Sequence, residues 1–87
     1  MSTGIVVFQN LDDVLEFVKK VEKYPYSMDM SRGKFVVDAR SLLSLVNLGF
    51  QKEIELKVYE DHCEDFWQDI EKYVAAKKAT RSIKDKI

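Results

Sequence analysis

Few residues in this chain have reactive side chains, and this limits the chemistry that it can perform. There is one histidine, His62, and one cysteine, Cys63, next to each other. A structural metal site needs about four ligands of such types, so no metal is predicted, and no motif for a bound cofactor is present. Cys63 stands at helical spacing from Phe66 and Ile70, which favours a core position over a reactive thiol. His62 is expected to be a surface residue at a helix start.

Ser41 is the residue with the clearest potential for modification. It follows Arg40 and precedes an apolar segment that ends at Gly49. Two interpretations stay open at this point. The hydroxyl can cap a short helix by accepting a hydrogen bond from a free backbone N–H. Alternatively, it can be phosphorylated, because a helix N-terminus favours an anion.

The spacing of apolar residues predicts the elements that position these side chains. Alternating or continuous apolar residues predict strands at residues 5–8, 24–30, 34–38 and 53–60. Helical spacing predicts helices at residues 11–23 and 42–47, and a last helix capped by Asp61 that extends to about Ala76. Asn10 is a suitable cap for the first helix. The order is β-α-β-β-α-β-α, and the alternating strand 53–60 indicates an antiparallel sheet with one wet face.

Composition is typical of one soluble domain spanning residues 1–87. The chain has 87 residues, 46% of them hydrophobic and 33% charged, with a net charge of −1. Binding to nucleic acid is therefore not expected, and no apolar run is long enough to cross a membrane. A single cysteine cannot form an internal disulfide, so a cytoplasmic location is expected. Residues 77–87 carry basic side chains with little apolar pattern, and we expect a mobile C-terminal end.

The segment from Arg40 through Ser41 to Leu48-Gly49 resembles the regulatory-serine segment of HPr, the histidine-containing phosphocarrier of the bacterial sugar phosphotransferase system. The likeness in element order and length covers residues 4–76. It implies an α+β fold: a two-layer sandwich with a four-stranded antiparallel sheet, in the order 1-4-2-3, and three helices on one face. The resemblance also implies a role in that system, with protein partners.

The sequence departs from the HPr pattern where the family carries its phosphorylated histidine. Matching backward from Lys23-Tyr24 places that position at about Asn10. Leu11 and Asp12 follow, where the family has an alanine and the arginine, and Asp13 falls near the family's proline. An amide cannot accept a phosphoryl group as imidazole does, and two carboxylates would repel one. The sequence therefore predicts a degenerate phosphohistidine site and no enzymatic activity. The structural alternative is that the same residues cap the helix.

The resemblance further implies a surface for partner proteins on the Ser41 helix. Its apolar residues are Leu42, Leu43, Val46 and Leu48. They cannot all point inward from so short a helix, and Leu43 is the best candidate for exposure. We therefore expect a regulatory or protein-binding module, monomeric or weakly dimeric. Two alternatives remain: a phosphocarrier that uses an unassigned residue, and a structural or oligomerising domain.

Overall fold

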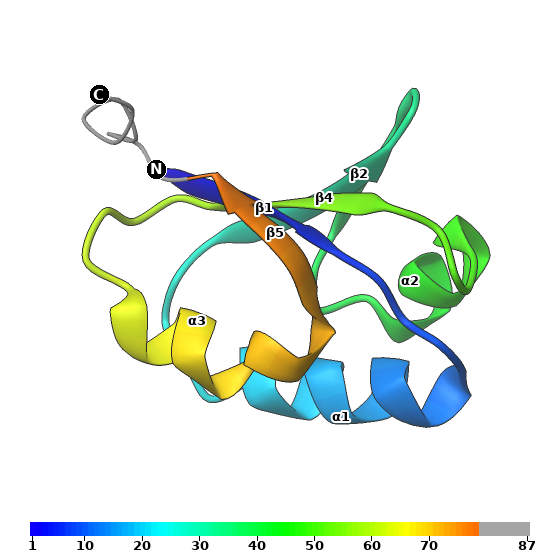
Figure 1. Cartoon of the computed structure of the whole chain (residues 1–87), viewed down its shortest axis with the longest axis horizontal. Helices are drawn as coiled ribbons and strands as arrows, with labels where there is room; N and C mark the ends of the chain where they lie inside the picture. Colours follow the sequence, from blue (N-terminus) through cyan, green and yellow to red (C-terminus); the bar gives the residue numbers. More distant parts are fainter. Residues whose placement is uncertain (79–87) are drawn as a thin grey trace.

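The computed structural model describes residues 1–78, which form an antiparallel sheet with helices packed on one side (Figure 1). The elements are β1 (Ser2–Val6), α1 (Leu11–Val21), β2 (Met28–Arg32), β3 (Phe35–Asp38), α2 (Leu42–Leu48), β4 (Ile54–Val58), α3 (Glu64–Asp69), the 3-10 helix η1 (Glu71–Tyr73) and β5 (Val74–Lys78). Among these residues, no helix combines the length and apolar character needed to cross a membrane.

The sheet has five strands in the order β3-β2-β4-β1-β5, so the expectation of a four-stranded sheet is wrong. Within this order β1, β4, β2 and β3 follow one another as expected, and β5 is added outside β1. Every pairing is antiparallel. The α+β class and the antiparallel sheet are therefore confirmed, and the number of strands is corrected.

The additional strand replaces the second half of the predicted last helix. That helix ends at Asp69, η1 follows, and Val74–Lys78 pairs with β1. Lys77 and Lys78, expected in a mobile end, belong to β5, while residues 79–87 lie outside the described part of the chain. Asp61 does not cap α3 either, because Cys63 holds the N-cap position and makes no side-chain cap bond. Asp61 instead pairs with the N-terminal ammonium group.

The connection between α1 and β2 is not a strand, although its aromatic residues alternate. Tyr24 and Tyr26 stack on each other with ring centroids 5.8 Å apart, and β2 begins only at Met28. The guanidinium group of Arg40 donates hydrogen bonds to the carbonyl oxygens of Tyr24 and Tyr26, at 2.8 and 3.1 Å. These bonds satisfy two carbonyl groups that lie outside the sheet and so lack a partner strand.

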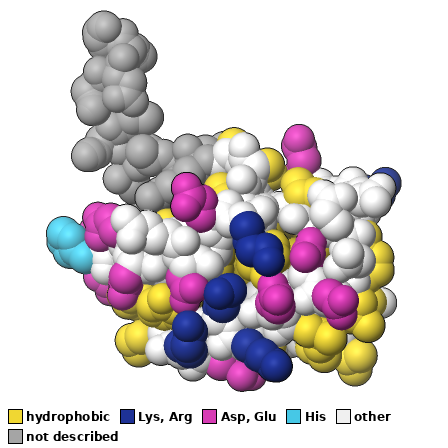
Figure 2. Space-filling view, turned by 60° about the horizontal axis from the view of Figure 1, so that its bottom comes forward, with side chains coloured by type: hydrophobic (Ala, Val, Ile, Leu, Met, Phe, Trp, Pro, Cys, Tyr) yellow, Lys and Arg dark blue, Asp and Glu magenta, His cyan; other side chains and the backbone are white. Residues whose placement is uncertain are grey.

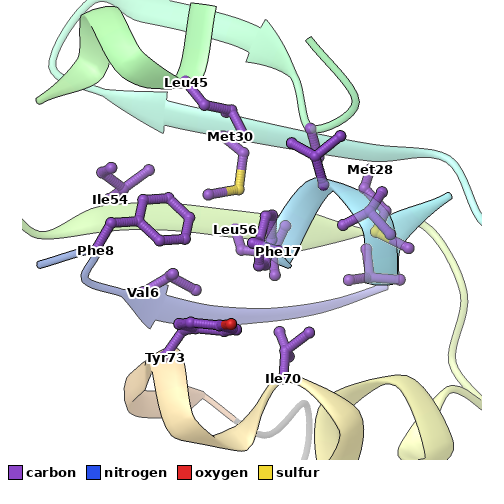
Figure 3. Packing of buried hydrophobic residues seen from close by; sticks show 14 of the residues in the cluster. Val6, Phe8, Phe17, Met28, Met30, Leu45, Ile54, Leu56, Ile70 and Tyr73 are labelled. Atoms are coloured by element: carbon purple, nitrogen blue, oxygen red, sulfur yellow. The ribbon is translucent and has the colours of Figure 1, made fainter. Parts of the chain in front are cut away.

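The core lies between the sheet and the helices (Figure 3). Its largest fully buried side chains come from every layer: Phe8, Phe17, Phe66, Met30, Leu45, Ile54, Leu56, Ile70, Val6, Val14, Val21 and Val58. Phe8 and Phe17 meet edge to face at 5.1 Å between centroids. Phe17 thus belongs to the buried face of α1, whereas Leu11 and Leu15 are 47% and 38% exposed.

Candidate functional site

The start of α1 is built as a helix cap. Asn10 has extended backbone angles, and its Oδ1 accepts a hydrogen bond from the Asp13 amide at 3.1 Å. Asp13 in turn accepts a bond on Oδ2 from the Gln9 amide at 2.9 Å. Asp12 and Asp13 both lie in the first turn, where carboxylates interact favourably with the helix dipole. The predicted cap at Asn10 is confirmed, and this end of α1 carries negative charge.

Ser41 stands at the N-cap of α2 without capping it. Its hydroxyl donates a hydrogen bond to the Ser44 Oγ at 3.0 Å, and no side-chain bond to the helix start forms. Only its backbone carbonyl takes part in the helix, by accepting from the Leu45 amide at 3.0 Å. The capping interpretation of the Ser41 side chain is therefore wrong. Arg40, the basic residue beside it, is bound to the α1–β2 connection instead of facing the serine.

The apolar residues of α2 divide between core and surface. Leu43 is 77% exposed, as expected. Leu42 and Val46 are half-buried and pack against the core cluster. Leu48 is only 4% exposed, so its proposed place on a partner surface is wrong: a helix of two turns buries the residue three positions after Leu45 on the same face.

Exposed leucines lie on both α1 and α2: Leu11 and Leu15 on α1, and Leu43 on α2. Glu16 and Lys20 contact η1 and α3 from one flank of α1. Helical spacing places Leu11 and Leu15 on the opposite flank, and α1 is in contact with α2. In Figure 2, hydrophobic side chains gather at the right-hand end, where Figure 1 shows α2 and the start of α1. We call Leu11, Leu15 and Leu43 the α1–α2 apolar surface.

A second cluster, absent from the sequence predictions, ties α1 to α3. The Asp69 carboxylate accepts hydrogen bonds from Lys20 Nζ at 3.0 Å and from the Tyr24 hydroxyl at 2.9 Å, and it pairs with Lys23 at 3.1 Å. Bonds from Lys20, Tyr24 and Lys23 lower the pKa of Asp69 to about 2. Burial, together with its bond to Asp69, raises the pKa of Tyr24 to about 12. Nothing in the local spacing of these residues indicated that they would meet.

The neighbouring contact between α1 and η1 has the same chemistry. The Tyr73 hydroxyl donates to Glu16 Oε1 at 2.5 Å, and Lys72 Nζ lies 3.2 Å from the same oxygen. The bonds from Tyr73 and Lys72 lower the pKa of Glu16, and burial, with its bond to Glu16, raises that of Tyr73. Both clusters fix the packing of helices, and they leave the α1–α2 apolar surface on the other flank.

His62 and Cys63 lie far from the start of α1. His62 is exposed in the loop before α3, and its amide donates to Glu60 Oε2 at 3.3 Å. The single histidine, cyan in Figure 2, appears at the end opposite to α2. Cys63 is buried, as predicted, with Sγ 3.3 Å from the Ser2 hydroxyl. Within residues 1–78, no group of three or more His, Cys, Asp or Glu side chains could hold a metal ion.

Comparison with known proteins supports the fold. The crystal structure of the phosphocarrier protein HPr from Bacillus anthracis strain Ames superimposes with a TM-score of 0.65 at 15% sequence identity. The match covers 83% of this chain and 94% of that one. No protein-family model matches the sequence, and no curated protein shows significant similarity to it. The chain therefore has an HPr-like fold, as the resemblance of the Ser41 segment implied.

Proposed function

We propose that this chain is a protein-binding module, related in fold to HPr, that does not carry phosphohistidine. The observation that supports it most is the start of α1. There, Asn10, Asp13 and Gln9 bond to one another, and the side chains contain no imidazole. The single histidine lies at the other end of the molecule. A phosphoryl group arriving beside Asn10 would meet two carboxylates, which repel its negative charge.

The partner would bind the α1–α2 apolar surface. Leu43 is the most exposed large hydrophobic residue in the described part of the chain, at 77%. Leu11 and Leu15 add apolar area from the neighbouring helix. Exposed apolar patches of this kind are typical of protein-binding sites. We expect a partner with an apolar contact at its centre, because Glu16 and Lys20 contact η1 and α3 on the other flank of α1.

Phosphorylation of Ser41 would regulate this binding. The hydroxyl is half-buried and already bonded to Ser44, so a phosphate there would break that bond and turn toward solvent. Ser41 lies two residues before Leu43. A group with about two negative charges beside an apolar contact would weaken the complex, because its hydration would be lost on binding.

The binding proposal can be tested with two matched variants. Wild-type protein, Leu43→Asp and Val36→Asp are immobilised and used to capture proteins from the source cells, with quantification by mass spectrometry. Val36 is also exposed, at 65%, but it lies on β3 and outside the α1–α2 apolar surface. Specific partners should be lost with Leu43→Asp and kept with Val36→Asp. Equal recovery with Leu43→Asp and wild type would contradict the proposed surface.

The alternative is a phosphocarrier that uses an unassigned residue. No contact among the described residues favours a particular nucleophile: the bond from His62 to Glu60 is made by its backbone amide, and Cys63 is buried. A direct assay of phosphoryl transfer separates this alternative from the binding module.

A further inference from the structure

Strand β3 is an unprotected edge of the sheet. It is the outermost strand next to β2, and its register with β2 runs from Asp38 to Phe35 without a bulge. Phe35 and Val36 are 68% and 65% exposed. Edge strands usually carry prolines, bulges or inward-pointing charges that prevent pairing with another strand. From Phe35 to Val37, β3 has none of these.

The register shows which backbone groups of β3 are available. In an antiparallel pair, alternate residues turn their N–H and C=O groups toward the neighbouring strand. The Ala39 amide donates to the Met28 carbonyl at 3.2 Å, so Ala39, Val37 and Phe35 turn toward β2. Val36 therefore turns its amide and carbonyl groups away from the sheet, toward the open edge.

The sequence of this edge is complementary to itself. In an antiparallel pair of two β3 strands centred on Val36, each Val36 lies opposite Val36 of the second copy. Phe35 then lies opposite Val37 of the second copy, and Lys34 is beside its Asp38. Opposite charges placed across a strand pair stabilise it. Among the described residues, Lys34 forms no ion pair, and the Asp38 carboxylate accepts a bond only from the Arg40 amide, at 2.8 Å.

We propose that two copies of this chain form a reversible dimer by antiparallel pairing of their β3 edges. The Val36 amide of each copy donates to the Val36 carbonyl of the other, and the two five-stranded sheets become continuous. The contact has two-fold symmetry, so it closes at two copies and does not propagate into a filament. The exposed Phe35 and Val36 side chains are covered on opposite faces of the joined sheet.

Charge reversal provides the most specific test. Lys34→Asp places aspartates on both sides of the contact, and Asp38→Lys places lysines there. The dissociation constant of the dimer should be about tenfold higher for each variant alone than for the wild type, because two attractive charge pairs become repulsive. An equal mixture of the two variants should regain the dimer, since the introduced aspartate of one copy then faces the introduced lysine of the other. Analytical ultracentrifugation measures the mass against that of one 10.2-kDa chain. Failure of the mixture to recover would overturn the pairing.

Amide hydrogen exchange gives a second test that needs no variant. Exchange at Val36 should slow as protein concentration rises, because its amide is bonded only in the dimer. Exchange at Val37, whose amide turns toward β2, should not change in parallel. Exchange at Val36 that is independent of concentration, or a wild-type chain that stays monomeric at millimolar concentration, would refute the dimer.

Two further variants separate this dimer from the proposed partner surface. Val36→Pro removes the exposed amide at an edge position where proline is tolerated, so it should abolish the dimer. Leu43→Asp should leave the dimer intact, because Leu43 lies on α2 and outside the β3 edge. A dimer that is lost with Leu43→Asp and kept with Val36→Pro would place the contact on the α1–α2 apolar surface and contradict the β3 model.

Discussion

Leu43 and Leu45 are two residues apart on α2 and lie in opposite environments: Leu43 is 77% exposed, and Leu45 is fully buried. Replacing Leu45 with alanine removes buried side-chain atoms and leaves a cavity, so we expect a loss of about 2–5 kcal/mol in the free energy of unfolding. Leu43→Ala should change it by less than about 0.5 kcal/mol. Urea unfolding followed by circular dichroism measures both. A comparable loss for Leu43→Ala would show that this side chain supports the fold.

Asn10 and Ser41 occupy equivalent cap positions, but only Asn10 forms a side-chain cap bond. Asn10→Ala should therefore lower the free energy of unfolding by about 1 kcal/mol. Ser41→Ala should lower it by less than about 0.5 kcal/mol, because its hydroxyl bonds to Ser44 and makes no cap bond to α2. The same urea measurements serve for this pair. If the two variants were equally destabilised, Asn10 would have no special role as the cap of α1.

The lowered pKa of Asp69 determines how its contribution to the free energy of unfolding depends on pH. Its bonds to Lys20, Tyr24 and Lys23 hold its pKa at about 2 in the folded chain, below the ordinary value of 3.8. The charged form is thus favoured by folding. This contribution is complete above about pH 4 and disappears as the pH falls through the folded pKa of about 2.

Asp69→Asn should remove that dependence. The wild type should be more stable than the variant at about pH 6, and the difference should shrink as the pH approaches the folded pKa. Thermal unfolding across this range provides the measurement. Glu53→Gln, which changes an exposed carboxyl group before β4, is the control and should follow the wild type. A constant difference between wild type and Asp69→Asn at every pH would rule out the ionised cluster as its cause.

A substitution at Gly4 tests the position of β5. A Cβ at this residue would lie 3.0 Å from the Trp67 ring and 3.0 Å from the Ala76 carbonyl oxygen. Gly4→Ala should therefore cost about 1–3 kcal/mol, because the ring or the strand must move. Thr3→Ala, at the neighbouring half-buried position, should cost less than about 1 kcal/mol. If Gly4→Ala unfolds at the same urea concentration as the wild type, β5 does not lie beside Gly4.

Local periodicity predicted the elements whose neighbours in sequence share a face. The face of α1 that contains Val14 and Val18 is buried, and Asn10 caps the helix. Local periodicity also placed Cys63 in the core, where it is buried. These features depend on spacing along one helix, which a sequence displays directly. The same reasoning identified Leu43 as the exposed leucine of α2.

The end of the domain could not be predicted in this way. Ile70 and Val74 are four residues apart, and alanine and lysine at residues 75–78 favour a helix. The chain forms a strand there because β1 offers an open edge, and that pairing joins residues about 70 positions apart. The contacts of Asp69 with Lys20 and Tyr24 are also distant in sequence. Such contacts follow from the tertiary fold and carry no local signal.

Intact mass spectrometry shows whether this chain carries phosphate on a histidine, and we propose that it does not. The protein is incubated with phosphoenolpyruvate and the general phosphotransferase enzyme that charges HPr, at neutral or alkaline pH, with an authentic HPr in parallel. We expect the HPr to gain one phosphate, about 80 Da, and this chain to gain none. A gain by this chain would contradict the account, and His62 would be the first residue to replace.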